Sequence, residues 1–296
     1  MKTFLRATAL TLSLIFVMTG FAVPFAALRA SAAETGEGLG ASAACEGHTL
    51  GTFSGLPACV NKNGDLHICK NNFPSKNFRS FLIATAFGST GYFDEKHYLT
   101  TLNVESRGIT SLRGIEFFTR LTSLSCGYNQ LTELDVSNNT ALISLSCSSN
   151  QLTELDVSNN TELQKLICTS NHLSELDVSK NKKLEYLTCN SNQRDLELIS
   201  KNGLWTADMS KLVSPSNFDR ITSFSQGTFD SKTGLLTFAG KPSSFTYKYD
   251  VGYVKNDRTM TVTVNLTEHI HSFSDWQVRT PASCTESGEE FRSCAC

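Results

Sequence analysis

Four cysteines recur at one interval in the middle of the chain: Cys126, Cys147, Cys168 and Cys189 are each 21 residues from the next. A thiol does nucleophilic or metal-binding chemistry as the thiolate, which forms in exposed, electropositive surroundings. Each cysteine follows a leucine by two positions, as Cys126 follows Leu124, and alternate side chains of a strand point the same way. We therefore predict that these thiols face inward and pack as small apolar side chains.

The other six cysteines fall into two sets, each accompanied by a histidine. The first set is Cys45, His48, Cys59 and Cys69, and the second is His271, Cys284, Cys294 and Cys296. Three thiols and one imidazole are ligand types of a tetrahedral zinc site. Disulfides are the alternative that export favours, with Cys59–Cys69 and Cys284–Cys294 as the simplest pairs. Each set then leaves one odd cysteine, so disulfides, zinc and free thiols all stay open, and we assign no metal and no cofactor.

Other catalytic patterns are missing from the sequence, which contains no G-x-S-x-G, no H-E-x-x-H and no glycine-rich phosphate loop. His172 lies near Cys168, but it replaces Gln130 and Gln151 of the sister repeats and so marks an outward position. Paired carboxylates recur at Glu133/Asp135, Glu154/Asp156 and Glu175/Asp177. Such a column attracts cations but most often forms a solvated face. We predict that the chain is not an enzyme and assign no catalytic residues.

A repeat determines where these side chains lie. Its first half reads LxxLxCxxN and its second half reads LxxLDVSxN. A fixed period of 21 residues indicates a unit that buries its apolar face only by stacking on identical neighbours. The asparagine that follows each strand is expected to hydrogen-bond backbone groups that no strand pairing satisfies. Two asparagine columns are predicted, the first with Asn129, Asn150, Asn171 and Asn192, and the second with Asn139, Asn160 and Asn181.

This pattern resembles the leucine-rich repeat, and its alternating halves of 10 and 11 residues resemble a subclass in secreted, internalin-like bacterial surface proteins. The resemblance implies a leucine-rich repeat solenoid of about five coils within residues 99–200. The first coil contains a Gly-Ile-Glu-Phe-Phe segment that we expect to form a short helical turn. The last coil has lost one residue, which places Leu196 and Leu198 one position early. Degenerate terminal coils are expected because they close the core of a solenoid against water.

Before the repeats, the chain begins with the features of an export signal. Residues 1–32 contain a basic start, an apolar stretch and the small residues Ala30-Ser31-Ala32, which together predict a secretory signal peptide. Residues 33–70 form a Cys-containing N-terminal segment. Residues 71–98 resemble the helical cap that precedes such arrays, although they lack the carboxylates of a calcium loop.

After the repeats, residues 201–268 alternate apolar and polar side chains between turn residues. They predict a small all-β domain similar to the immunoglobulin-like caps that follow bacterial leucine-rich repeats. Its expected core is Ile221, Leu236, Phe245, Tyr247 and Val262. Residues 269–296 resemble the start of a His/Trp/Cys surface module, which we expect to be truncated at Cys296.

These observations predict an exported protein, extracellular or at the surface of a Gram-positive bacterium. The mature chain has no apolar run long enough to cross a membrane and no basic stripe for nucleic acid. We predict a binding module that recognises an extracellular protein or glycan. The expected face is Ser123, Ser125, Tyr128, Ser144, Ser146, Lys165, Ile167, Tyr186 and Thr188. The alternatives are a structural spacer within a larger surface protein, or the non-catalytic part of an enzyme whose catalytic domain lies beyond Cys296.

Overall fold

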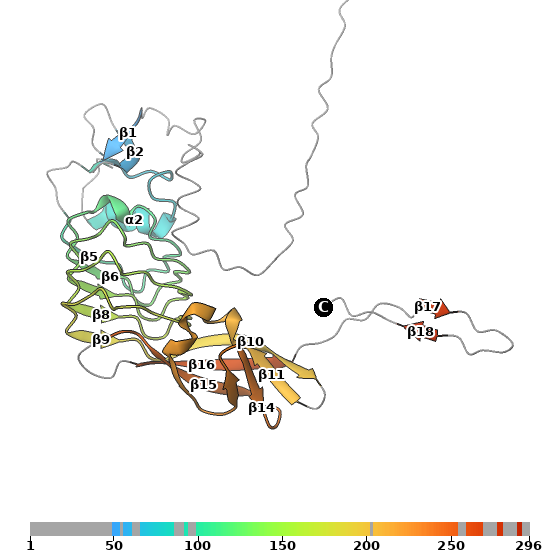
Figure 1. The fold of residues 1–296 in the computed structure, drawn as a ribbon. Coiled ribbons are helices and arrows are strands. Elements are labelled where there is room, and N and C mark those ends of the chain that lie inside the picture. Colours follow the sequence, from blue (N-terminus) through green and yellow to red (C-terminus); the bar gives the residue numbers. More distant parts are fainter. Residues whose placement is uncertain are drawn as a thin grey trace, which may run out of the picture. The chain divides into compact units, whose positions relative to one another are not determined.

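Five short parallel strands, one from each coil, form a sheet along the repeats (Figure 1). They are β5 (Thr101–Asn103), β6 (Ser123–Ser125), β7 (Ser144–Ser146), β8 (Lys165–Ile167) and β9 (Tyr186–Thr188). Each strand pairs in register with the next, so that Leu124 lies between Leu102 and Leu145. The structure is a computed structural model that describes residues 49–53, 56–60, 66–85, 92–93, 99–201, 204–253, 259–268, 277–280 and 289–291. The predicted stacking of the repeats is confirmed.

The interior of the solenoid repeats from coil to coil. The side chains of Cys126, Cys147 and Cys168 have no exposed surface, and Cys189 is also buried. In the strands, the central leucine is buried while the serines on either side of it are half-exposed, as in β6 and β7. The alternation predicted from the sequence therefore places leucine and cysteine inside together.

The first asparagine column ties each coil to the one before it. The amide nitrogen of Asn150 donates to the carbonyl oxygens of Cys126 and Cys147, both at 3.0 Å. Its Oδ1 atom accepts from the backbone N–H of Leu131 at 3.0 Å. Asn171 makes the equivalent contacts one coil later. Both polar atoms of these buried amides are satisfied, as burial requires.

The second asparagine column lies at another corner of the coils. Its amide nitrogens form hydrogen bonds, but its amide oxygens do not. The amide nitrogen of Asn160 donates to the carbonyl oxygens of Val136 and Asn139, and Asn181 donates in the same way one coil later. The Oδ1 atoms of Asn139, Asn160 and Asn181 are buried and accept no hydrogen bond from the described residues. The two columns are therefore equivalent in sequence but unequal in their hydrogen bonding.

The described residues on the N-terminal side of the solenoid include an α-helix and a small sheet. The helix is α2 (Lys76–Thr85), and the sheet has the order β1 (Thr49–Phe53), β2 (Leu56–Val60), β3 (Leu66–His67), β4 (Tyr92–Phe93). Asn77 of α2 donates to the carbonyl oxygens of Arg107 and Gly108 in the first coil. That coil also contains the predicted helical turn, as the 3-10 helix η2 (Ile115–Phe117).

The C-terminal side carries a seven-stranded mixed sheet with the order β12-β15-β16-β10-β11-β14-β13. Its strands are β10 (Asn192–Lys201), β11 (Leu204–Asp208), β12 (Ile221–Phe224), β13 (Thr228–Asp230), β14 (Leu235–Phe238), β15 (Ser244–Asp250) and β16 (Thr259–Glu268). Two 3-10 helices, η3 (Met209–Lys211) and η4 (Pro215–Arg220), connect β11 to β12. The central strand β10 pairs in parallel with β16 and antiparallel with β11.

This sheet changes the interpretation of the last repeat. The sequence pattern predicted that Leu196 and Leu198 belong to a shortened final coil, but both lie in β10, where Leu196 pairs with Leu266 and Leu198 with Ala207. Asn192 still belongs to the first asparagine column, because its Oδ1 accepts from Leu173 N–H at 3.0 Å. The same residue begins β10, so the chain passes from the solenoid to the sheet without a linker.

Aromatic rings fill the core of the seven-stranded sheet. Phe245 lies 5.7 Å from Phe238 and 6.2 Å from Phe224, measured between ring centroids. Phe224 of β12 also lies 5.1 Å from Phe229 of β13, although these strands are at opposite ends of the sheet order. The sheet must therefore curl until its two edges meet over one core. Of the core residues predicted for this domain, Leu236, Phe245, Tyr247 and Val262 are buried, and Ile221 is half-buried.

Several predicted segments lie wholly or mainly outside the described residues. These include the signal peptide 1–32 and the cysteines Cys45, Cys284, Cys294 and Cys296. Within 269–296, only the backbones of β17 (Gln277–Thr280) and β18 (Glu289–Phe291) are described, and these strands pair antiparallel. Cys69 is a buried free cysteine in this structure, and the side chain of Cys59 lies outside the described residues.

Candidate functional site

The predicted binding face coincides with the outward side of the strands. The residues that alternate with the buried leucines on β6 to β9 are Ser123, Ser125, Ser144, Ser146, Lys165, Ile167, Tyr186 and Thr188. Lys165 and Tyr186 are exposed, whereas the four serines are half-buried. Because the strands pair in register, these side chains form straight rows across four coils.

Tyr128 presents its ring from an unusual backbone conformation. It follows β6, is 67% exposed and has a φ of 55°. The equivalent positions in the other coils, Ser106, Ser149, Ser170 and Ser191, have the same left-handed backbone. This region is disfavoured for residues other than glycine, and a bulky side chain there is rare. The geometry of the coil imposes the conformation on every repeat, and the second coil alone uses it to display an aromatic ring.

A second aromatic residue, Tyr186 of β9, lies three strands further along the same sheet. Tyr186 is 51% exposed, and the Lys165 ammonium group lies 5.6 Å from the centroid of its ring. Between the two tyrosines, Ser144 and Ser146 of β7 are half-buried, and Thr169 Oγ1 donates to Ser148 Oγ at 3.2 Å. Aromatic and long cationic side chains usually supply most of the energy of an interface. The strand face therefore offers two aromatic rings and one cation on a rigid polar background.

The column of thiols has no chemistry of its own at neutral pH. Burial raises the pKa of Cys147 to about 12, and it raises the pKa values of Cys126 and Cys168 well above the ordinary thiol value. All three thiols therefore stay protonated and are weak nucleophiles. His172 is exposed whereas Cys168 has no exposed surface, so the two do not form a nucleophile–base pair.

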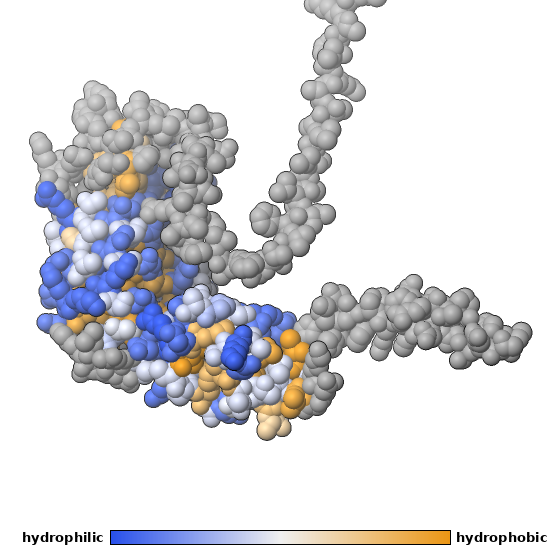
Figure 2. Space-filling view, viewed as in Figure 1, coloured by the Kyte–Doolittle hydropathy of each residue, from blue (hydrophilic) through white to orange (hydrophobic). Residues whose placement is uncertain are grey.

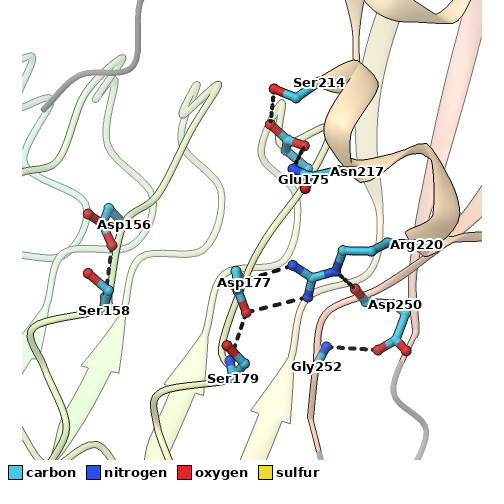
Figure 3. Close-up of polar contacts among 10 residues, drawn as sticks. All are labelled: Asp156, Ser158, Glu175, Asp177, Ser179, Ser214, Asn217, Arg220, Asp250 and Gly252. Atoms are coloured by element: carbon cyan, nitrogen blue, oxygen red, sulfur yellow. Dashed lines mark hydrogen bonds and ion pairs between the residues drawn. The ribbon is translucent and has the colours of Figure 1, made fainter. Parts of the chain in front are cut away.

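The column of paired carboxylates, predicted to face solvent throughout, makes contacts with the rest of the chain at its last pair. Figure 3 shows that the pair Glu175/Asp177 meets η4 and its flanking residues. Glu175 accepts from Asn217 Nδ2 at 2.9 Å and from Ser214 Oγ at 3.4 Å. Asp177 lies 3.3 Å from Arg220, measured between Oδ2 and Nη1. The sequence predicted a solvated face, and this pair instead joins the solenoid to the seven-stranded sheet.

Three residues of this junction were missed by the sequence analysis: Ser214, Asn217 and Arg220. They are spaced three apart, and side chains three apart eclipse on a 3-10 helix. That spacing, which begins just before Pro215, was a local sign that one side of a tight turn is polar. Nothing local, however, indicates that this side meets carboxylates about 40 residues earlier in the chain.

The junction also fixes the state of the Asp177 carboxylate. Partial burial works to raise its pKa, but hydrogen bonds from Ser179 and the contacts with Arg220 outweigh burial and lower the pKa below its ordinary value. Arg220 is itself held by its Nε atom, which donates to the Asp250 carbonyl at 2.8 Å, and by the Tyr249 ring at 5.1 Å. Asp177 therefore remains ionised and paired at neutral pH.

Buried tyrosines complete the junction. Tyr247 of β15 donates its hydroxyl hydrogen bond to the Ser174 carbonyl at 2.6 Å, and Tyr253 donates to the Glu185 carbonyl at 2.9 Å. The Val178 N–H also donates to the Val251 carbonyl at 2.9 Å. Backbone groups of the fourth and fifth coils are thus satisfied by the sheet domain.

The surface composition agrees with a polar solenoid. On the face drawn in Figure 2, hydrophilic residues predominate over the solenoid and apolar residues gather over part of the seven-stranded sheet.

Within the described part of the chain, no cluster of three His, Cys, Asp or Glu side chains has the arrangement of a metal site. Among the same residues, no helix has the length and apolar character that a membrane crossing requires.

The repeat and the stacked parallel strands form a leucine-rich repeat solenoid. The chain is similar to internalin J of Listeria monocytogenes serotype 4b, with 42% identity over 83 residues, which cover 27% of this chain. The match spans only 9% of that relative's length. No family model matches the chain.

Solved structures of the same kind are also similar. The functional domain of internalin J from Listeria monocytogenes, described as including a cysteine ladder, is 43% identical, with a TM-score of 0.40. That similarity covers 42% of this chain and 28% of the other. An internalin from Listeria monocytogenes strain 4b F2365 is 26% identical, covering 48% of this chain and 40% of the other with a TM-score of 0.35.

Proposed function

We propose that this chain is an exported, non-enzymatic binding module that recognises a protein or a glycan outside a bacterial cell. The observation that carries the proposal is the strand face, where Tyr128, Lys165 and Tyr186 project from the second, fourth and fifth coils of one in-register stack. A rigid scaffold lowers the entropy lost on binding, so a few anchors on a regular face can hold a partner. Similarity to internalins supports a surface protein that binds other proteins.

The test begins with a pull-down in which the exported chain, residues 33–296, is the bait and extracts of host and bacterial surfaces supply the candidate partners. For a captured partner, Tyr186→Ala should weaken binding by about 1–2 kcal/mol, a loss of roughly five- to thirty-fold. Ser146→Ala is the matched control, because it changes the same face without removing an aromatic anchor, and it should have little effect. The strand-face assignment would be wrong if replacing Tyr128 and Tyr186 by alanine left the affinity for the partner unchanged while neutralising Glu154 and Asp156 lowered it.

A structural spacer is the second candidate, and the junction supports it. The carboxylates of Glu175 and Asp177, together with the hydroxyls of Tyr247 and Tyr253, hold solenoid and sheet together by direct contacts rather than by a linker. The strand face also has few anchors among many serines. Capture of no partner across broad panels would favour the spacer.

We also propose roles for the flanking parts. Helix α2 would cap the first coil, supported by the contacts of Asn77 with Arg107 and Gly108. The seven-stranded sheet would be an immunoglobulin-like cap for the last coil, supported by its curled aromatic core. Residues 1–32 would be removed on export, and residues 269–296 would begin a separate surface module. Mass spectrometry of the secreted protein would test the first cleavage directly.

A further inference from the structure

The corner that follows strands β6 to β8 displays one side chain that the fold does not need. The ring of Tyr128 is largely exposed, and it meets no other ring and no cation among the described residues. Its backbone has a φ of 55°, an angle at which the sister coils place serine. A bulky side chain in this left-handed region is disfavoured. A large residue kept at a strained and exposed position, where it adds nothing to the packing, indicates a role in binding.

The residue before Tyr128 supports the same interpretation. At the position of Gly127 the next three coils carry Ser148, Thr169 and Asn190. Gly127 is not among the glycines with a positive φ, so its backbone angle does not require glycine. A Cβ atom at Gly127 would lie 3.2 Å from the Ser148 carbonyl oxygen. The coil that displays the ring therefore lacks the side chain that its neighbours place beside this position, and a ligand meets less obstruction there.

The rest of this corner is polar and carries no acidic or basic side chain. We call its side chains the corner ridge: Tyr128, Gln130, Ser149, Gln151, Thr169 and Ser170. All of them are exposed or half-buried, and the side-chain amides of Gln130 and Gln151 form no hydrogen bond with the described residues. Amides and hydroxyls both donate and accept hydrogen bonds. The ridge therefore offers hydrogen bonds in both directions and no charge for a charged ligand to pair with.

Hydrogen bonds between the coils hold the ridge in place. The Tyr128 N–H donates to the Ser148 carbonyl at 2.9 Å, and the Ser149 N–H donates to the Thr169 carbonyl at 3.0 Å. The ridge therefore repeats at the spacing of paired strands, about 4.7–4.9 Å. This spacing is close to the length of one pyranose ring in a linear oligosaccharide. A rigid row loses little entropy when a ligand of matching repeat binds along it.

An uncharged oligosaccharide has the chemistry that this ridge matches. The apolar C–H face of a pyranose stacks on an aromatic ring, and sugar hydroxyls donate and accept hydrogen bonds as the ridge does. The core of a protein interface is instead mainly apolar, and the ridge has only one ring. We propose that the corner ridge binds a short, uncharged oligosaccharide, with one sugar stacked on Tyr128 and the next hydrogen-bonded to Gln130 and Gln151. This inference rests on the binding function proposed above and names the ligand class for its Tyr128 end.

The probes are neutral tetrasaccharides that differ in linkage: cellotetraose, maltotetraose, chitotetraose and mannotetraose. Each is titrated into the isotope-labelled exported chain and followed by NMR. At least one should shift the backbone amide resonances of Tyr128, Gln130 and Gln151 saturably. The uronic acid form of the tightest probe, which carries a carboxylate on each sugar, should bind more weakly by about fivefold or more, because the ridge has no cation to pair with it.

Two variants of one residue test the stacking. Tyr128→Ser introduces the side chain of the sister coils and should weaken binding by about tenfold or more, whereas Tyr128→Phe keeps the ring and should bind within about twofold of wild type. Ile143→Ala is the matched control, because it removes an exposed apolar side chain that lies before β7 and outside the ridge. It should leave the affinity unchanged. The melting temperature of Tyr128→Ser should equal or exceed that of wild type, since serine is less strained than tyrosine at this backbone angle.

Four results would overturn the proposal. They are no saturable shift with any neutral tetrasaccharide, equal losses of affinity in Tyr128→Ser and Ile143→Ala, equal binding of the uronic acid form, and a melting temperature of Tyr128→Ser below that of wild type. The last result would mean that the ring supports the fold. If no tetrasaccharide binds but a captured protein partner depends on Tyr186, the ligand class is wrong while the proposed binding function stands.

Discussion

The solenoid and the seven-stranded sheet bury their cores in opposite ways. In the solenoid, every coil supplies the same leucine, cysteine and asparagine, and each buried group meets its counterpart in the adjacent coil. In the sheet, rings from distant strands converge on one place, where Phe245 meets Phe224 and Phe238. Stability in a repeat array is close to a sum over neighbouring units. The comparison teaches that damage should stay local in the solenoid and become general in the sheet.

The largest effect is expected from a charge placed in the column of thiols. Cys147→Asp would bury an unpaired carboxylate where the wild-type side chain has no exposed surface. The expected loss exceeds about 5 kcal/mol in the free energy of unfolding, enough to unfold the third coil and its neighbours. Hydrogen exchange by mass spectrometry should show lost protection in β6 to β8. Ser146→Asp, one residue away on the outward side, is the control and should leave protection intact.

The next effect tests the sheet. Phe245→Ala removes a buried ring from the centre of the aromatic core, and such truncations cost about 3–5 kcal/mol. Protection should fall together in β12, β14 and β15, since rings from all three strands meet there, while β6 and β7 keep theirs. Thr246→Ala, at the half-buried neighbouring position, is the control. If Phe245→Ala loses protection in β15 alone, damage to the sheet stays as local as damage to the solenoid, and the proposed difference between the two regions is wrong.

An intermediate effect separates buried from exposed asparagines within the solenoid. Asn150→Ala leaves the backbone groups of Cys126, Cys147 and Leu131 without their partner and should cost about 1–3 kcal/mol. Asn159→Ala removes one 3.4 Å contact at an exposed position and should change stability by less than about 0.5 kcal/mol. Thermal melts of the two variants give the comparison. Equal shifts in melting temperature would show that the first asparagine column does not stabilise the coils.

The smallest effect concerns the boundary between the two regions. Because the folded-state pKa of Asp177 lies below its ordinary value of 3.8, its ionised form stabilises the fold above pH of about 4. That contribution is lost as the pH falls through the lower folded-state pKa. The difference in unfolding free energy between wild type and Asp177→Asn should therefore shrink between about pH 5 and pH 2. The difference should be at most about 1 kcal/mol, because the pair is partly exposed. A difference that grows with acid would contradict the assigned contact.

Repetition explains how much of this structure is readable from the sequence. The inward cysteines and the first asparagine column are predictable because the same residues recur at the same positions in four coils. The transition at Asn192 is not, because that residue keeps its repeat role while Leu196 and Leu198 already alternate as a strand. The junction is harder still, since Arg220 and Asp177 are 43 residues apart and neither has a local sign of the other. The strand face is readable as a face, but the exposed ring of Tyr128 depends on a backbone angle that only the structure gives.

The parallel pairing of β10 with β16 has a mechanical consequence. The solenoid feeds into β10 at Asn192, and the chain leaves β16 at Glu268, so tension along the chain pulls these two ends in opposite directions. Asn192 pairs with Val262 and Leu198 pairs with Glu268, which places the two loaded ends at opposite ends of the ladder. The interstrand hydrogen bonds are then loaded in shear, all at once, rather than opened one by one. Pulling the solenoid away from the C-terminal end of β16 would therefore require all of these hydrogen bonds to break together.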